Sequence, residues 1–453
     1  MRIPQVPPTI LELLNRGVGD KLNDILSSGI GKLPSDRYLH WDELRRRPVP
    51  DQNFNCEEWW LATKLARSVA QHKLPFTDKN GKHFFYTESG YLYRLLHKID
   101  QDASGGIGMP EHVTSSEERN RYLARSIMEE AITSSQLEGA VTTRRVAKEM
   151  LRSGRQPRNQ SERMIYNNYH AMEFARELSN ESLSIPMILE LQRIVLDDTD
   201  HIDAAGRFRY KSENVRIVDV RYQEIVHIPP DADEIPSRME RLIKFANNGE
   251  DEEFIHPVVR SIVLHFMIGY DHPFVDGNGR TARALFYWSM ARSGYWLTEF
   301  LSISTILRKA PVKYARAYLF TETDENDVTY FLDYNLRVII RSLLELKEYL
   351  ARKVGQIRNE RLLLEEAGFA VSLNHRQLAL LGSMRTNPDL IYTIESHRRS
   401  HGVTYQTART DLLKLVELRL LESDKSGRKF TFRLKQDFGR RLFDLASQNQ
   451  NNY

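Results

Sequence analysis

Apolar positions recur at helical spacing along much of this chain, most clearly on both sides of residue 272. The segment before it predicts a buried helix that ends near Tyr270. The apolar positions of that segment are Val258, Val259, Ile262, Val263, Phe266 and Ile268. After residue 281 the pattern resumes with Ala282, Leu285, Phe286, Trp288 and Met290. The stretch between the two is predicted to be a loop, and residues 277–279 are predicted to open the second helix.

A further helix is predicted upstream, over residues 120–138. Its buried stripe would consist of Leu123, Ile127, Ala131 and Ser134 or Ser135. Gly139 is a natural helix stop. Glu138 therefore falls at the helix C-terminus, where a carboxylate is mildly unfavourable against the helix dipole. It is either a solvated side chain or the partner of a specific cation.

Alternating side chains over residues 215–218 and 225–228 predict a short hairpin, which follows a Gly-Arg-Phe-Arg run at 206–209. The residues alone do not separate an ordinary surface hairpin from a functional one.

The end of the chain has a different pattern. Helices are predicted over residues 376–384, 392–399 and 404–421, followed by a bend at 425–429 and a strand over 430–434. This layout resembles a winged helix-turn-helix. From residue 370 onward there are 14 Lys and Arg against 8 Asp and Glu, whereas the whole chain carries a net charge of only +3. The candidate DNA contacts are Tyr405, Gln406, Arg409 and Lys414 on the third helix and Lys425, Arg428 and Lys429 on the wing. A protein-contact module is the alternative.

Length and composition restrict the remaining possibilities. The 453 residues suffice for two or three domains. A single cysteine, Cys56, excludes an internal disulfide and a multi-cysteine zinc site. No apolar run reaches membrane-spanning length, and the first ten residues lack signal-peptide features, so we expect a cytoplasmic protein without a membrane partner. Aromatic residues in the first 105 positions indicate a packed cap, with a hairpin turn at 78–81.

The chemistry concentrates in residues 272–283, HPFVDGNGRTAR. His272 can take up a proton near neutral pH, and Asp276 is a hard oxygen ligand suited to Mg²⁺. Glycines at a helix N-terminus let an anion approach free backbone N–H groups. Arg280 and Arg283 lie one turn apart and suit a polyphosphate. A structural or degenerate anion site is the alternative to a catalytic one.

The same twelve residues match the Fic signature, H-x-F-x-D/E-G-N-G-R-x-x-R, at every defining position. The resemblance implies a mainly helical bundle with a small hairpin flap. It also implies transfer of AMP from ATP to a hydroxyl of a target protein, with His272 deprotonating that hydroxyl. Asp276 would hold Mg²⁺ on the alpha and beta phosphates. The anion hole would be formed by Gly277, Asn278 and Gly279, and the beta and gamma phosphates would be gripped by Arg280 and Arg283.

Residues 134–139, SSQLEG, resemble the inhibitory motif of the same family, S/T-x-x-x-E-G/N, through Ser134, Glu138 and Gly139. In that family the glutamate pairs with the second arginine of the signature, here Arg283, and denies it to the gamma phosphate. Two positions depart from the family pattern: Tyr314 is followed by alanine, and Gln192 stands where many members have histidine.

We therefore expect a cap over 1–105, a Fic catalytic domain over 106–355 with its inhibitory helix at about 120–139, and a winged-helix-like domain over 360–445. The expected activity is that of an autoinhibited protein adenylyltransferase using ATP and Mg²⁺. Its targets would be a protein docked near a flap at about 214–228 and the chain itself. Removal of AMP, another phosphate donor, or a nucleotide-sensing DNA-binding regulator are alternatives. The sequence also leaves a homodimer open.

Overall fold

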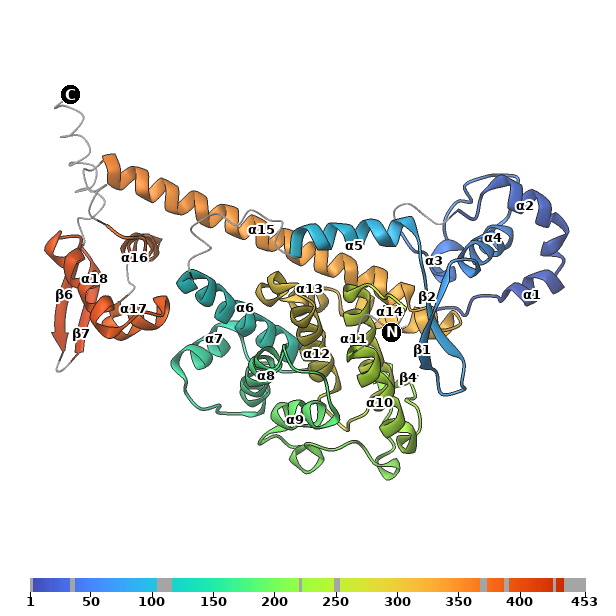
Figure 1. Cartoon of the computed structure of the whole chain (residues 1–453), viewed down its shortest axis with the longest axis horizontal. Coiled ribbons are helices and arrows are strands. Elements are labelled where there is room, and N and C mark those ends of the chain that lie inside the picture. The colour runs from blue at the N-terminus through green and yellow to red at the C-terminus, as the bar shows by residue number, and fades with distance from the viewer. Residues whose placement is uncertain are drawn as a thin grey trace. The chain divides into compact units, whose positions relative to one another are not determined.

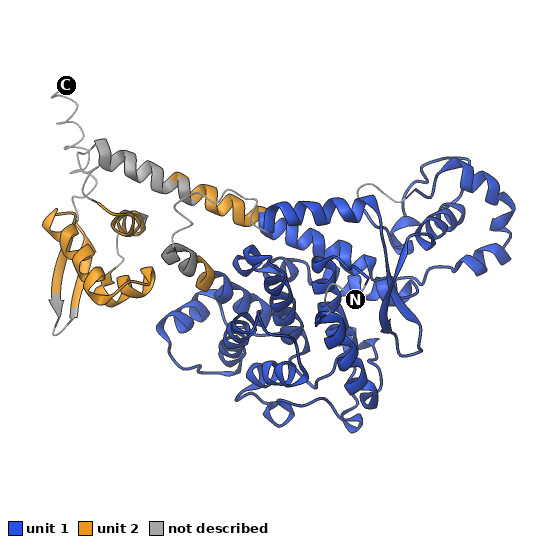
Figure 2. Cartoon of the chain, viewed as in Figure 1, with its two compact units in different colours: residues 1–107, 126–343 blue, residues 108–125, 344–453 orange. Residues whose placement is uncertain are grey.

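Helices make up most of the structure, as the sequence pattern predicts (Figure 1). The computed structural model describes residues 3–32, 37–103, 116–219, 222–247, 253–366, 373–386, 391–426 and 429–435. The chain divides into two units, residues 1–107 with 126–343 and residues 108–125 with 344–453 (Figure 2). No helix among the described residues is both long enough and apolar enough to cross a membrane.

Two consecutive helices, α11 (Pro257–Asp271) and α12 (Asn278–Arg292), form the centre of the first unit. Almost every side chain of both helices is buried. The prediction of two apolar helices around a short loop is confirmed. The neighbouring helices are α8 (Gln160–Glu177), α9 (Ile185–Leu196) and α10 (Ile235–Asn247).

The other helices of this unit are α1 (Ile10–Asn15), α2 (Leu22–Ser28), α3 (Trp41–Leu44), α4 (Cys56–Ser68), α5 (Gly90–Ala103), α7 (Arg144–Ser153), α13 (Ile303–Lys309) and α14 (Pro311–Thr323). Helices α6 (Ser116–Leu137) and α15 (Thr329–Glu366) contribute residues to both units. The predicted stripe of α6 is buried, including both Ser134 and Ser135. Gly139 follows the helix with φ +104°.

Two antiparallel hairpins belong to the first unit. Strands β1 (Gln71–Thr77) and β2 (His83–Thr87) flank the predicted turn, where the Asp78 side chain accepts hydrogen bonds from the backbone of Asn80 and Lys82. Strands β3 (Ile217–Asp219) and β4 (Glu224–His227) pair Ile217 with His227 and Asp219 with Glu224. The predicted second hairpin is therefore present, with a first strand one residue shorter than predicted and a second strand that begins one residue earlier.

The second unit ends in three helices and a small sheet. These elements are α16 (His375–Thr386), β5 (Tyr392–Thr393), α17 (Ile394–His401), α18 (Tyr405–Glu417), β6 (Leu421–Ser426) and β7 (Lys429–Leu434), with strand order β5-β7-β6. Two boundaries differ from the prediction. Thr393 is extended because its hydroxyl caps α17, and α18 stops early because Arg419 adopts φ +59° before Leu421 enters β6. Strand β6 is not predicted by the sequence, because residues Leu421–Ser426 are mostly polar and do not alternate between apolar and polar positions.

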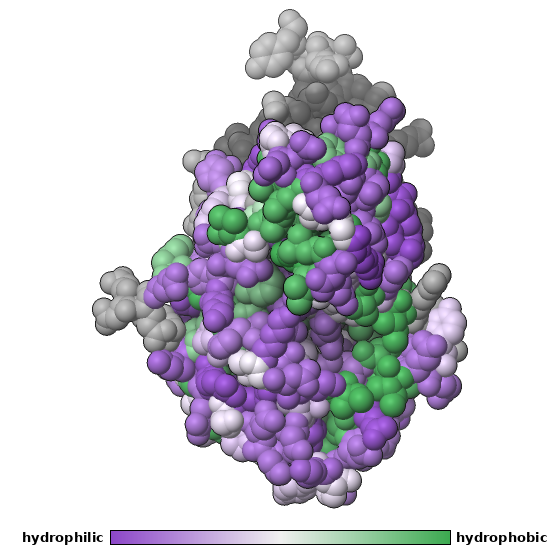
Figure 3. All heavy atoms as spheres, turned by 90° about the vertical axis from the view of Figure 1, so that its right-hand side faces the viewer, coloured by the Kyte–Doolittle hydropathy of each residue, from purple (hydrophilic) through white to green (hydrophobic). Residues whose placement is uncertain are grey.

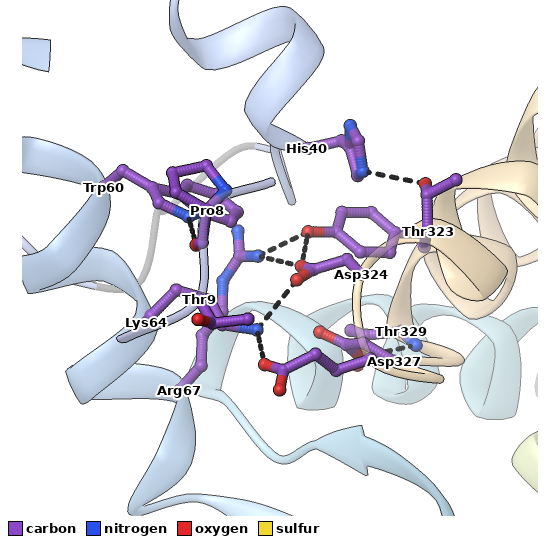
Figure 4. Close-up of polar contacts among 12 residues, drawn as sticks. Pro8, Thr9, His40, Trp60, Lys64, Arg67, Thr323, Asp324, Asp327 and Thr329 are labelled. Carbon is purple, nitrogen blue, oxygen red and sulfur yellow. Dashed lines mark hydrogen bonds and ion pairs between the residues drawn. The ribbon is translucent and has the colours of Figure 1, made fainter. Parts of the chain in front are cut away.

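A buried charge network attaches the N-terminal region to the segment after α14 (Figure 4). Arg67 on α4 donates to the Tyr330 hydroxyl at 2.6 Å and to the Leu39 carbonyl at 2.7 Å. Lys64 pairs with Asp324 at 2.8 Å, and Tyr330 also donates to Asp324 at 2.6 Å. Arg67 and Asp324 are each 1 % exposed. These contacts explain why the first 107 residues share a unit with 126–343.

The outer surface beside α1, α2 and α4 is mainly hydrophilic, with apolar groups between the polar ones (Figure 3). Apolar side chains that remain exposed in the first 30 residues are Ile3, Val6, Leu11, Leu14 and Leu26. Scattered exposed apolar residues of this kind are normal for a folded chain.

Substitution Arg67→Met should lower the free energy of unfolding by about 3 to 5 kcal/mol, because it leaves buried Asp324 with one cation fewer and the Leu39 carbonyl without its donor. Urea denaturation measures the change. The matched control is Arg46→Met, which removes an arginine that is 54 % exposed from its ion pair with Asp42 and should cost less than about 1 kcal/mol. Equal losses in the two variants would contradict a stabilising role for the buried network.

Candidate active site

The loop between α11 and α12 is fixed by its own side chains. The Asn278 amide accepts a hydrogen bond from the Phe274 backbone N–H at 3.0 Å and donates to the Phe274 carbonyl at 2.9 Å. Phe274 itself is fully buried. Gly277 adopts φ +86° at the N-cap of α12. The Asn278 side chain thus braces the loop, while its backbone lies in the first turn of α12.

His272 follows α11 in a left-handed conformation, with φ +46° and ψ +58°. Its Nδ1 lies 3.2 Å from the Gly269 carbonyl oxygen. Because a carbonyl only accepts, Nδ1 carries the proton and Nε2 keeps its lone pair. Burial lowers the pKa of His272 to about 4. The imidazole is therefore neutral at pH 7 and able to accept a proton.

Asp276 and Arg280 form an ion pair at 2.9 Å. The Arg280 guanidinium is 1 % exposed and also donates to the Val195 carbonyl at 3.3 Å. The Asp276 carboxylate is 40 % exposed, so it is open to a ligand. The structure places both residues at the loop. The Arg280 guanidinium, however, is already bound to the Asp276 carboxylate and the Val195 carbonyl.

Asp276 could contribute one oxygen to a magnesium ion. Within the described ranges there is no group of three or more His, Cys, Asp or Glu side chains suited to a metal. Mg²⁺ is commonly held by one or two carboxylates together with substrate phosphates and water. A single exposed carboxylate next to an anion site fits that manner of binding.

Arg283 is as deeply buried as Arg280, at 1 % exposure. Its Nη2 donates to Glu138 Oε1 at 2.7 Å, and its Nε donates to the Ser134 hydroxyl at 2.7 Å. Nη2 also approaches the Ser134 carbonyl at 3.3 Å. The structure therefore brings Ser134 and Glu138 of the motif to Arg283, which lies 145 or more residues further along the sequence.

The Glu138 carboxylate lies against the first turn of α12. A Cβ atom built on Gly279 would stand 2.1 Å from Glu138 Oε1 and 3.1 Å from Arg283 Nη1. Nη1 is buried and has no hydrogen-bond partner among the described residues. A carboxylate thus occupies the space that the glycine leaves open at a helix N-terminus, beside an arginine with donor capacity to spare. Such a position suits a phosphate.

Several contacts around the site carry no sequence signal. Gln192 on α9 donates to the Asp276 carbonyl at 3.2 Å and accepts from the Gly206 N–H at 2.6 Å, so the residue that departs from the family pattern braces the loop. Glu130 on α6 is buried and accepts from the Ser304 N–H at 3.1 Å and the Ser302 hydroxyl at 2.9 Å. Burial raises the pKa of Glu130. The residues that contact Gln192 and Glu130 lie too far from them in the sequence for these pairings to be predicted from it.

The DNA-contact candidates lie in the second unit. Gln406 and Arg409 are exposed on α18, and Lys414 is partly exposed. Arg428 lies outside the described residues, and the side chains of Lys425 and Lys429 are not described.

Comparison with known proteins places the site in a family. Residues 182–290, which include α9, the hairpin β3–β4, α11 and most of α12, match the model of the Fic/DOC family. This part of the chain is a Fic domain. The match leaves out α6 and Glu138, the residue that directly follows α6.

The chain is 36 % identical over 138 residues to the protein adenylyltransferase Fic of Drosophila melanogaster, covering 29 % of this chain and 25 % of that protein. It is 33 % identical over 116 residues to the protein adenylyltransferase Fic of Nematostella vectensis, covering 26 % of this chain and 25 % of that protein. The match thus spans about a quarter of the length of these relatives.

A Fic family protein from Desulfovibrio desulfuricans G20 has a similar structure, with a TM-score of 0.50. The similarity covers 80 % of this chain and 99 % of that one at 19 % identity. At this identity the likeness concerns the fold, which extends beyond the Fic domain itself.

If the space above Gly279 receives a phosphate, Gly279→Ala should weaken ATP binding even when Glu138 is removed. In the Glu138→Gly background the added methyl group would still lie close to Arg283 Nη1, and the loss of one charge-assisted hydrogen bond should lower affinity by roughly ten-fold. Titration with a fluorescent ATP analogue measures it. Gly355→Ala, whose added Cβ meets nothing within 4 Å, is the control. Unchanged affinity in the Gly279 variant would place the phosphates elsewhere.

Proposed function

We propose that this chain is an autoinhibited protein adenylyltransferase that transfers AMP from ATP to a hydroxyl side chain of a target protein. The observation that carries the proposal is the contact of Arg283 with Glu138 at 2.7 Å, directly over the first turn of α12. The relatives named protein adenylyltransferase support the reaction class, and the neutral His272 in the same loop supplies the base.

In the proposed reaction His272 Nε2 takes the proton of the target hydroxyl, and the hydroxyl oxygen attacks the alpha phosphorus of ATP. The bond from that phosphorus to the bridging oxygen of the leaving group breaks, and pyrophosphate departs. The N–H groups of the first turn of α12 and the Arg283 guanidinium stabilise the charge on the phosphates. A magnesium ion held by Asp276 would neutralise phosphate charge and orient the leaving group.

The restraint follows from competition for one guanidinium. While Glu138 accepts from Arg283, its carboxylate fills the space above Gly279 and repels an incoming gamma phosphate. ATP then lies in a pose in which the alpha phosphorus is not aligned with the incoming hydroxyl. Removing the carboxylate frees both the space and the arginine.

The target segment would dock on the hairpin β3–β4. Val218 and Ile225 are each 41 % exposed on its two strands, and Tyr222 beside the turn is 62 % exposed. A short exposed hairpin can align an extended peptide by strand addition. A docked target protein and a segment of the chain itself are both candidates, which makes automodification a convenient readout.

Substitution Glu138→Gly should raise the incorporation of label from alpha-labelled ATP into the chain, because it frees Arg283 for the gamma phosphate. An increase on the order of ten-fold or more corresponds to the loss of one charge-assisted contact. Mass spectrometry then checks for an added AMP group. Adding His272→Ala in that background should abolish transfer.

An unchanged rate in the Glu138→Gly chain would contradict autoinhibition, and transfer without His272 would remove it from the mechanism. AMP removal from a modified target would favour the reverse direction. ATP binding without any covalent product would favour the regulator that senses nucleotide.

A second function, DNA binding by residues 373–435, is favoured by one observation: Arg409 is exposed on α18 one helical turn after Tyr405 and Gln406, which are also exposed. The order helix, strand, helix, helix, strand, strand with sheet order β5-β7-β6 supports a winged helix-turn-helix. In that fold the third helix, here α18, enters the major groove.

Substitution Arg409→Ala should weaken binding to duplex DNA and reduce its salt dependence by about one unit of slope, since one phosphate or base contact is lost. Fluorescence anisotropy over a range of salt concentrations measures both. Lys313→Ala removes an exposed positive charge from the other unit and is the control. The absence of salt-sensitive binding to any duplex would assign the domain to protein contacts.

A further inference from the structure

The C-terminal end of α11 is held by side chains from outside the signature. A helix leaves its last four carbonyl groups without partners inside the helix. Here the Arg209 guanidinium donates through Nε to the His272 carbonyl at 2.8 Å and through Nη2 toward the Asp271 carbonyl at 3.4 Å. His227 Nε2 meets the Tyr270 carbonyl at 2.7 Å. Three consecutive carbonyls, 270 to 272, thus have partners.

Arg209 makes two further contacts of the same kind. Its Nη2 donates to the Pro230 carbonyl at 2.6 Å, and its backbone N–H donates to the Pro273 carbonyl at 2.9 Å. Arg209 lies before β3 and Pro230 lies after β4, so one buried guanidinium joins both ends of the hairpin segment to the loop that carries His272. Arg209 is 7 % exposed and forms no ion pair among the described residues.

These contacts stabilise a strained backbone conformation at His272. A residue other than glycine in the left-handed region is strained, and this conformation persists only when its surroundings enforce it. His272 has φ +46°, and its carbonyl is the one that Arg209 Nε binds. The contact fixes the peptide group that follows His272, and with it the direction of the imidazole.

We propose that Arg209 is a positioning residue for His272: its forked contacts with the carbonyls of 271, 272 and 230 hold the base in line and couple it to the base of the hairpin. The inference rests on the proposed function, in which His272 is the base. Arg209 touches neither the phosphates nor the target hydroxyl in that mechanism, so it acts through His272.

The electrostatics of the site supply a separate readout. Burial is the main cause of the low pKa of His272. Of the groups that face it, the Gly269 carbonyl and Glu138 raise the pKa, whereas His227 and Arg209 lower it. Removing the Arg209 charge should therefore raise the pKa of His272, whether or not ATP is present.

The experiment compares Arg209→Met, Arg209→Lys and Arg207→Met in the full-length Glu138→Gly chain. Arg207 is the matched control, because it lies two residues away. Among the described residues, the polar and ring contacts of its side chain are with Asp203, Phe208, Tyr210 and Glu213. Transfer is measured over a range of ATP concentrations. The titration of His272 is followed by NMR on chain labelled at histidine, with the signal assigned by its loss in His272→Ala.

For Arg209→Met we expect kcat to fall on the order of ten- to a hundred-fold, with KM for ATP changed less than about two-fold, because a small misplacement of the base affects only the chemical step. The pKa of His272 should rise. Arg209→Lys should return that pKa toward its original value but recover kcat only in part, since an ammonium lacks the planar fork. Arg207→Met should behave as the parent.

The proposal would be overturned if Arg209→Met lowered kcat and raised KM for ATP by the same factor. It would also be overturned if Arg209→Met left both kcat and the His272 titration unaltered. If Arg209→Met does not fold, Arg209→Lys decides: reduced kcat at normal KM supports positioning, and normal kcat excludes it. Absence of transfer in the Glu138→Gly chain with Arg209 intact would instead contradict the proposed function. The His272 titration would then still show whether Arg209 governs that imidazole.

Discussion

The burial of the Arg283 guanidinium is the constraint on which the candidate site depends. A charge at 1 % exposure is stable only when hydrogen-bonded and paired, and here Ser134 and Glu138 provide both. The same requirement applies when an anion competes for it. A ligand that displaces Glu138 would have to bring its own negative charge, which favours an anion over a neutral group.

Helix α6 is held firmly enough to present Glu138 at this point. Glu129 on α6 pairs with Arg144 of α7 at 2.6 Å and also contacts Lys148, and Asn168 on α8 donates to the Ala131 carbonyl at 3.1 Å. Ser135 donates to the Met164 carbonyl at 3.1 Å. The helix is thus bonded on several sides before its last residue. The Glu138 side chain, which directly follows the helix, is 33 % exposed and so has room to turn away.

The sequence revealed those features that are local. Residues 272–283 can be recognised as a candidate site because their chemically active residue types are adjacent in one loop. The helices around them are predicted by the spacing of apolar positions. The pairing of Glu138 with Arg283 could be suggested only through a family motif, since no periodicity connects positions 145 apart. The contacts of Gln192 and Arg209 with the loop backbone could not be predicted from the sequence, because they depend on tertiary structure. The two bonds of the Asn278 amide with Phe274 are likewise visible only in three dimensions.

The unequal exposure of Glu138 and Arg283 has a consequence for timing. A partly exposed side chain changes rotamer in picoseconds to nanoseconds, far faster than any helix displacement. The restraint therefore sets the fraction of molecules in which Arg283 is available at any instant. If the contact is worth about 3 kcal/mol, that fraction is roughly one per cent. Under the proposed function, a chain restrained in this way would keep a low rate of transfer, and any change in the populations of the Glu138 rotamers would change that rate in proportion.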